Sequence, residues 1–257
     1  MRDDLCPTEV WDMPGVVSEY SRPRNLQFPE VMIFIKYREN IWGQRILDVG
    51  CGGGRTSYIL KKMAKSYIGI DSSEEMIAAC RQKFGADAFM CADVRNLHVF
   101  KDCSFDFVLF SFNGLDCITH EGRLQGLREI CRVLKPGKLF VFSSHNRNFR
   151  YAQTTPKLSF CINPITQVKN IYYFILFTRN YRCNKKREVF CPEYAIIRSE
   201  QHRFAHLYYY IDKKTQIAQA QQVGFQIIEM HDLEGNVLQE DSEDSHVAWI
   251  YYVAKKI

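Results

Sequence analysis

The chain has 257 residues, 46% of them apolar, and a formal net charge of +5 at neutral pH. This length and composition suit one large α/β domain, or one domain with a sizeable insertion, and exclude a disordered chain. The longest purely apolar run, residues 171–177, is far shorter than the roughly 20 residues that cross a bilayer, so we expect no membrane span and no membrane partner.

The N-terminal part predicts two helical stretches between Glu9 and Asn40, separated at residues 21–24. In the second stretch, apolar residues recur at the spacing of one helix face, so this stretch should pack on the domain. Those residues are Phe28, Val31, Met32 and Ile35. We assign residues 1–44 to an N-terminal helical lid.

Residues 45–143 alternate short apolar runs with amphipathic stretches of helix length, a pattern typical of a parallel sheet with crossover helices. The predicted strands are 45–49, 67–70, 88–91, 105–110 and 138–143. The predicted helices are 55–64, 73–84 and 121–133, and a turn at Lys135-Pro136-Gly137 ends the last helix. We expect this part of the chain to form the core that binds a cofactor.

The alternation fails over residues 144–212, which we interpret as an α+β insertion after the fifth strand that covers the acceptor site. The insertion has a predicted helix at 165–177 and two β-like runs at 193–198 and 203–211. It also has a basic cluster: Arg179, Arg182, Lys185, Lys186 and Arg187. Residues 213–257 then complete the sheet with a helix at 213–223 and strands at 225–231 and 246–254.

A glycine-rich turn, Asp48-Val49-Gly50-Cys51-Gly52-Gly53-Gly54, follows the first predicted strand. In an open parallel sheet this turn approaches a bound ligand closely, and glycines remove the Cβ atoms that would collide with it. A dinucleotide fingerprint, G-x-G-x-x-G, would require glycine at position 55, where the chain has Arg55. The carboxylate of Asp48 favours a cationic ligand, so NAD is the second choice of cofactor.

The run from Leu47 to Gly54 resembles the first motif of the class I, Rossmann-like S-adenosylmethionine-dependent methyltransferases of the small-molecule type. The resemblance covers roughly residues 45–143, with weaker support from Gly224 to the end. It implies a three-layer α/β fold with a seven-stranded, mostly parallel sheet whose last strand is antiparallel. It also implies S-adenosyl-L-methionine as the cofactor and methyl transfer as the activity.

The resemblance further implies roles for two acids at strand ends. Asp71 would accept both ribose hydroxyls, and Asp93 would receive the adenine amino group beside the Val94 amide. Taken alone, Asp71 could cap the helix that begins near Ser73, and Asp93 could belong to a surface turn. The residues that we assign to the cofactor are Asp48, Gly50, Cys51, Gly52, Gly54, Asp71, Ser72, Met76, Asp93, Val94, Phe110 and Ser111.

The acceptor side is expected after the fourth and fifth strands. A general base is needed only for a protonated acceptor, and His145 is our candidate, with Asp116, His202 and His206 as alternatives. Asn113 and Asp116 could instead be turn formers. The predicted substrate-binding residues are Tyr20, Asn113, Asp116, His145 and Tyr208, with Tyr20 as part of the lid.

We therefore expect methyl transfer to an oxygen or nitrogen of a small-molecule acceptor by in-line displacement. No Asn-Pro-Pro-Tyr or Asp-Pro-Pro-Tyr segment follows the fourth strand, which disfavours the subgroup that methylates nucleic-acid amino groups and glutamine. The tyrosines of the insertion suit a small, partly apolar acceptor. The basic cluster leaves open a tRNA or RNA methyltransferase, and a non-catalytic protein that binds S-adenosylmethionine is a further alternative.

The chain terminus and the cysteines favour a cytoplasmic protein. Residues 1–4 include acids and lack the apolar stretch of a secretory signal. The ten cysteines occur singly, without the Cys-x-x-Cys or histidine spacing of a zinc site, so we expect a reduced compartment and no metal. The oligomeric state is left open.

Overall fold

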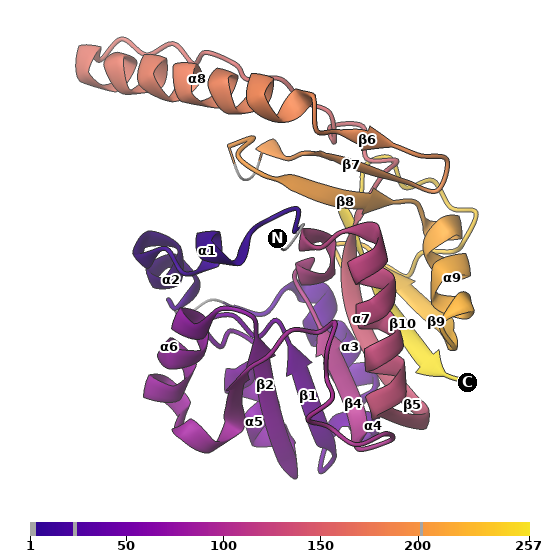
Figure 1. The fold of residues 1–257 in the computed structure, drawn as a ribbon. Coiled ribbons are helices and arrows are strands. Elements are labelled where there is room, and N and C mark those ends of the chain that lie inside the picture. The colour runs from indigo at the N-terminus through magenta and orange to yellow at the C-terminus, as the bar shows by residue number, and fades with distance from the viewer. Residues whose placement is uncertain (1–3, 23–24, 201–202) are drawn as a thin grey trace.

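A twisted sheet runs through the centre of the computed structural model, which describes residues 4–22, 25–200 and 203–257 (Figure 1). Five parallel strands lie side by side in the order β3 (Phe89–Cys91), β2 (Ser66–Asp71), β1 (Arg45–Val49), β4 (Phe105–Phe110) and β5 (Leu134–Asn146). Antiparallel to β5 lies β10 (Trp249–Lys256), which also pairs with β9 (Phe225–His231). The predicted seven-stranded sheet with an antiparallel last strand is therefore confirmed.

The helices cover both faces of this sheet, because the central strands are apolar on both faces. On one face lie α3 (Phe28–Lys36), α4 (Arg38–Ile41), α5 (Ser57–Met63) and α6 (Glu74–Phe84), whose buried apolar residues pack in one core cluster with Ile46 and Phe107. The predicted packing face of α3 is wrong, because Phe28, Met32 and Ile35 are exposed and Ile33 and Phe34 are buried. On the other face lie α7 (His120–Val133) and α9 (Lys213–Gln222), which pack against Leu47 and Val108. Alternate residues of the same strands thus belong to two separate hydrophobic cores, one on each face of the sheet.

The strand order reverses between β1 and β4, which places the crevice of a doubly wound sheet at their carboxyl ends. Two short helices, α1 (Thr8–Trp11) and α2 (Pro14–Tyr20), lie over this edge (Figure 1). A Cβ atom on Gly53 would lie 2.5 Å from the backbone oxygen of Tyr20. A glycine is therefore required where the end of α2 rests on the first strand-to-helix turn. The predicted break at residues 21–24 lies partly outside the described residues.

The predicted turn at residues 135–137 is wrong as a separate element, because β5 already begins at Leu134. Phe105 pairs with Leu134 and Phe107 pairs with Leu139, so the intervening residues of β5 bulge out of register. Gly137 has a φ of 73° within that bulge, a conformation that glycine adopts without strain. The residues predicted to form a turn therefore lie inside β5, as part of its bulge.

The insertion extends the same sheet past the end of β5. Strand β8 (Leu207–Ile211) pairs in parallel with His145 and Asn146, and β7 (Tyr194–Arg198) and β6 (Val189–Phe190) follow it outward. A helix longer than predicted, α8 (Pro164–Lys185), projects from the body of the molecule (Figure 1). Within the described ranges, no helix combines the length and the apolar character needed to cross a membrane. The shorter elements are the 3-10 turns η1 (Ala86–Ala88) and η2 (Gly114–Cys117).

Candidate active site

A cavity opens at the carboxyl ends of β1 to β5, beneath α1 and α2. It is lined by residues of the predicted cofactor-binding set and of the predicted substrate-binding set, although these residues lie far apart in the sequence. They are Tyr20, Asp48, Gly50, Cys51, Gly52, Asp71, Ser72, Met76, Asp93, Val94, Phe110, Ser111, Asn113, His145 and Tyr208. Gly54 and Asp116 do not line it. A Cβ atom on Gly54 would lie 2.4 Å from the ring of Phe84, so this glycine serves helix packing.

The glycine turn is shaped by close contacts on one side and open space on the other. A Cβ atom on Gly50 would lie 2.7 Å from the Phe110 ring, whereas one on Gly52 would meet no protein atom within 4 Å. Both glycines have positive φ, 62° and 51°. The Gly52 amide donates to Asp71 Oδ2 at 2.8 Å, and the Ser73 amide donates to Oδ1 at 3.0 Å. These bonds fix the Asp71 carboxylate at the cavity wall.

The acids of this wall are poorly solvated. Asp48 is buried, and its Oδ2 accepts hydrogen bonds of 2.7 Å from the Thr56 and Tyr67 hydroxyls. Burial still dominates and raises the pKa of Asp48 to about 6. Burial also raises the pKa of Asp71, against the backbone amides that lower it. Because desolvation penalises the charged carboxylates, a cation placed in the cavity would stabilise them.

Arg95 ties the N-terminal segment to the third strand end. Its guanidinium contacts Asp93 at 2.5 Å and Asp4 at 2.6 Å, and these opposite charges raise the Arg95 pKa further. Nearby, Ser73 donates to Asp12 at 2.6 Å. The segment before α3 is therefore held across the cavity by polar contacts at two points. Sequence reasoning did not identify Arg95, because its second partner, Asp4, lies in a part of the chain without a recognisable motif.

A buried ion pair joins α3 to the glycine turn. Glu30 is fully buried, and Arg55 contacts its two carboxylate oxygens at 2.5 and 2.7 Å. The hydroxyls of Ser111 and Tyr251 also donate to Glu30. Sequence reasoning used Arg55 only to exclude a dinucleotide fingerprint. Its pairing with an acid from a separate helix could not be predicted from either local pattern.

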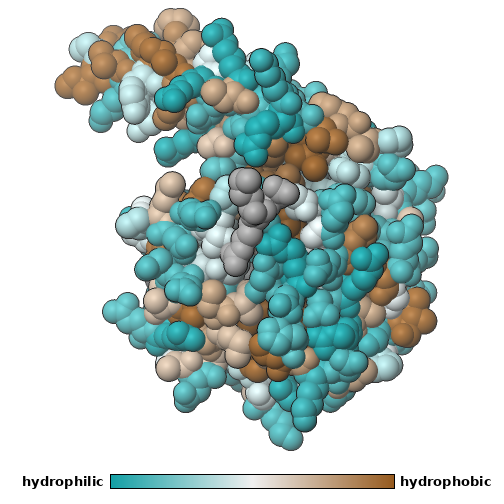
Figure 2. All heavy atoms as spheres, in the orientation of Figure 1, coloured by the Kyte–Doolittle hydropathy of each residue, from teal (hydrophilic) through white to brown (hydrophobic). Residues whose placement is uncertain are grey.

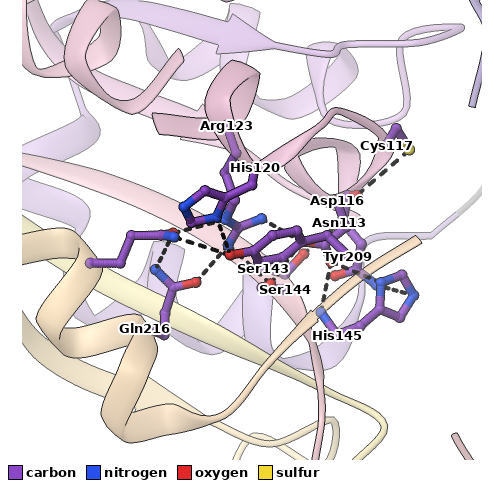
Figure 3. Close-up of polar contacts among 11 residues, drawn as sticks. Asn113, Asp116, Cys117, His120, Arg123, Ser143, Ser144, His145, Tyr209 and Gln216 are labelled. Atoms are coloured by element: carbon purple, nitrogen blue, oxygen red, sulfur yellow. Dashed lines mark hydrogen bonds and ion pairs between the residues drawn. The ribbon is translucent and has the colours of Figure 1, made fainter. Parts of the chain in front are cut away.

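His145 lies at the cavity with its ring oriented by Asp116 (Figure 3). Asp116 Oδ2 is 2.8 Å from His145 Nδ1 and accepts from the His145 backbone amide at 2.7 Å. An ionised carboxylate only accepts hydrogen bonds, so Nδ1 carries a proton, and in the neutral imidazole the lone pair is then on Nε2. Asn113 Nδ2 lies 3.3 Å from Nε2, as a donor to that lone pair would. The pair thus presents a basic nitrogen beside the cavity.

Arg123 holds Asp116 from the other side. This fully buried guanidinium is 2.5 Å from Asp116 Oδ1 and donates to Gln216 at 2.6 Å and Gln219 at 2.9 Å (Figure 3). Ser144 also donates to Asp116 Oδ1, at 2.7 Å. Asp116 therefore lies behind His145 and orients it. The sequence also predicts a direct contact between Asp116 and the substrate, but Asp116 does not line the cavity. Arg123 was not predicted, since it reads as an ordinary polar residue of an amphipathic helix.

The turn after β4 is held in an unusual conformation. Phe112 and Asn113 both have a φ of 59°, in the left-handed region that costs a residue with a side chain about 1–2 kcal/mol. The Asn113 amide donates to Ser143 Oγ at 2.8 Å, which secures the turn against β5. Together these constraints aim the Asn113 side chain at His145.

Aromatic side chains complete the wall of the cavity around His145. Trp249, opposite His145 in the β5–β10 register, lies edge-on to both His145 and Phe112. Burial raises the pKa of Tyr208 well above its usual range, which keeps this phenol neutral. Of the alternative bases, His206 does not line the cavity and His202 lies outside the described residues. Trp249 was missed because its position depends on the register of an antiparallel strand.

Comparisons with known proteins point to one family. Residues 46–137 match the family model described as a methyltransferase domain. The ubiquinone biosynthesis O-methyltransferase of Coxiella burnetii is 28% identical over 134 residues, which are 50% of this chain and 55% of the relative. The phthiotriol/phenolphthiotriol dimycocerosates methyltransferase of Mycobacterium tuberculosis is 35% identical over 114 residues, 42% of this chain and 40% of the relative. The chain spans about half the length of the curated relatives it matches.

A solved structure extends the likeness to nearly the whole fold. The CcbJ methyltransferase of Streptomyces caelestis superimposes with a TM-score of 0.61 at 15% identity, over 94% of this chain and 96% of that one. At this identity the likeness concerns the fold.

Removal of the Arg55 charge tests the buried ion pair. Arg55→Met leaves the Glu30 carboxylate buried without its cation, so we expect a loss of roughly 3–5 kcal/mol in the free energy of unfolding, measured by urea denaturation. The double variant Glu30→Met/Arg55→Met should recover at least half of that loss. Arg38→Met, on the exposed side of a neighbouring helix, is the control and should change stability little. Equal stability of Arg55→Met and the wild type would contradict this account.

Proposed function

We propose that this chain, a class I methyltransferase by its matched domain and its fold, transfers the methyl group of S-adenosylmethionine to an oxygen or nitrogen of a small molecule. One observation supports the choice of acceptor atom: His145, with its Nδ1 held by Asp116, lines the same cavity as the glycine turn. An acceptor that loses a proton on methylation needs such a base. An acceptor that carries no proton does not.

The residues of the cavity fit the cofactor. Asp71, Asp93 and Val94 all line the cavity, and we assign Asp71 to the ribose hydroxyls and Asp93 with Val94 to the adenine. The open space at Gly52 leaves room for a ligand beside the turn. Asp48 would offset positive charge on the ammonium and sulfonium groups, which in turn would relieve the cost of burying its carboxylate. The bound cofactor supplies a methyl group on a positively charged sulfur.

The chain itself supplies orientation and a proton acceptor. His145 Nε2 would take the proton that the acceptor's hydroxyl or amine loses when its oxygen or nitrogen is methylated. Asp116 stabilises the imidazolium that forms, and Arg123 keeps Asp116 in place. General-base catalysis of this kind contributes roughly 10²–10⁴ in rate. Holding the acceptor and the cofactor in one cavity contributes further to the rate, because both lose translational and rotational freedom before the reaction.

The aromatic wall supports an acceptor with a flat or apolar part. Tyr20, Phe112, Tyr208 and Trp249 line the cavity together with His145. We propose that the N-terminal segment up to residue 44 covers the cofactor and that the insertion over residues 144–212 covers the acceptor. The basic cluster of the insertion is absent from the described lining of the cavity, which favours a small acceptor over RNA. A non-catalytic protein that only binds S-adenosylmethionine would not need a histidine oriented in this way.

Calorimetry tests the cofactor assignment. Wild-type protein should bind S-adenosylmethionine and bind NAD much more weakly. Asp71→Asn should weaken S-adenosylmethionine at least tenfold, because hydrogen bonds to a charged group contribute about 1.5–3 kcal/mol each. The control Asp87→Asn, on an exposed 3-10 turn, should bind as the wild type does. Tight NAD binding without S-adenosylmethionine binding would contradict the assignment.

Turnover tests the base. With a panel of phenols and amines as acceptors, the wild type should release S-adenosylhomocysteine with at least one of them. His145→Gln should lower kcat by roughly 10²–10⁴ while the Kd for S-adenosylmethionine stays within about twofold. The control is His98→Gln, an exposed histidine that contacts Asn96. Methylation of tRNA with no turnover of the panel would overturn the small-molecule proposal.

A further inference from the structure

The helix α8 and the chain before it form a projecting arm, residues 157–187, with two chemically different parts. We call residues 160–177 the tip and residues 179–187 the collar. The tip exposes large apolar side chains on several sides: Phe160 (85%), Ile162 (103%), Ile165 (70%), Val168 (68%), Tyr172 (62%) and Ile175 (62%). Figure 2 shows hydrophobic residues, drawn as brown spheres, gathered at the free end of the arm. Exposed apolar surface of this extent marks an interaction site.

The base of the arm is fastened to the body. Asn184 donates to the backbone oxygens of Phe204 and Ala205 at 3.0 Å. The Arg198 guanidinium lies 3.7 Å from the centre of the Tyr181 ring and donates to the Tyr181 backbone oxygen. The direction of the arm is therefore set by the fold. The exposure of the tip is a fixed feature of the molecule.

The Lys and Arg side chains of residues 147–187 give this stretch positive charge only. No Asp or Glu occurs between residues 147 and 187. The basic residues of the same stretch are Arg147, Arg150, Lys157, Lys169, Arg179, Arg182, Lys185, Lys186 and Arg187. Most of the collar is exposed. Each basic residue near an anionic bilayer surface contributes about 1 kcal/mol of attraction.

We propose that the arm attaches the protein to the surface of an anionic membrane, with the tip in one leaflet and the collar among the lipid headgroups. Residues 165–177 are about 20 Å long as a helix, enough to enter one leaflet and too short for the roughly 30 Å hydrocarbon core. Lys169 can extend its charge toward the interface. The expectation of no membrane partner came from run length, which excludes a span and leaves surface attachment open.

Other occupants match only one part of the arm. Two copies paired through their arms would bring together basic collars without an acid in either stretch to offset them. A nucleic acid would pair with the collar and leave the aliphatic side chains of the tip in water. A lipid surface supplies both anionic groups and hydrocarbon at the spacing of tip and collar.

Vesicle flotation with the full chain tests this proposal. We expect binding to phosphatidylglycerol/phosphatidylcholine vesicles at 0.1 M salt and much weaker binding to phosphatidylcholine alone or at 0.5 M salt. The variant Ile165→Ser/Val168→Ser/Ile175→Ser should bind the anionic vesicles at least roughly tenfold more weakly. The matched control, Ile35→Ser/Ile228→Ser/Val237→Ser, removes exposed apolar side chains of the same types elsewhere and should bind as the wild type does.

The collar has its own test. Arg179→Gln/Arg182→Gln/Lys186→Gln should lose binding to anionic vesicles, whereas Arg38→Gln/Lys62→Gln/Lys214→Gln should keep it. Wild-type protein that fails to float with anionic vesicles overturns the proposal. So does a dimer, seen by analytical ultracentrifugation, that only the tip variant dissociates. Calorimetry with S-adenosylmethionine on the same variants keeps this outcome separate from the proposed catalytic function, because none of these residues lines the cavity.

Discussion

The cost of burying negative charge at neighbouring strand ends is the constraint on which this site depends. Asp48 and Asp71 stand at the carboxyl ends of β1 and β2, and burial raises the pKa of both. Their positions follow from the parallel sheet, and their hydrogen bonds hold them at the cavity wall. A cationic ligand stabilises such a wall, whereas a pyrophosphate would add charge of the same sign. The choice of cofactor is thus a matter of electrostatics as well as of motif.

Different groups of residues line the two ends of the cavity. The glycine turn and the acids of β1 to β3 line the cavity where we propose the cofactor, and His145 with Asn113 lines it where we propose the acceptor. Both ends are supported by a buried charged pair, Glu30 with Arg55 and Asp116 with Arg123. Arg55 itself lines the cavity, whereas Asp116 and Arg123 do not. Each fixes a residue or a turn that does line the cavity.

The fold and the cofactor side could be predicted because their signals are local. Strand-length apolar runs, helix periodicity and a glycine turn between them lie within short windows, and the acids follow strands at fixed places. The residues missed depend on packing between distant segments. Arg55 and Arg123 pair with buried acids on other elements, and the position of Trp249 depends on the antiparallel register. Gly54, which we assigned to the cofactor, instead leaves room for the Phe84 ring. The direction in which α8 leaves the body likewise depends on tertiary contacts.

The protonation of Asp48 tests the account most directly. Carbon-13 NMR of the side-chain carboxyl, assigned by comparison with Asp48→Asn, measures its pKa without and with S-adenosylmethionine. The account predicts a pKa of about 6 in the free protein and a clear fall when the cofactor binds, because the cation stabilises the carboxylate. A pKa that stays unchanged or rises on binding would contradict the central claim that buried acids select a cationic cofactor.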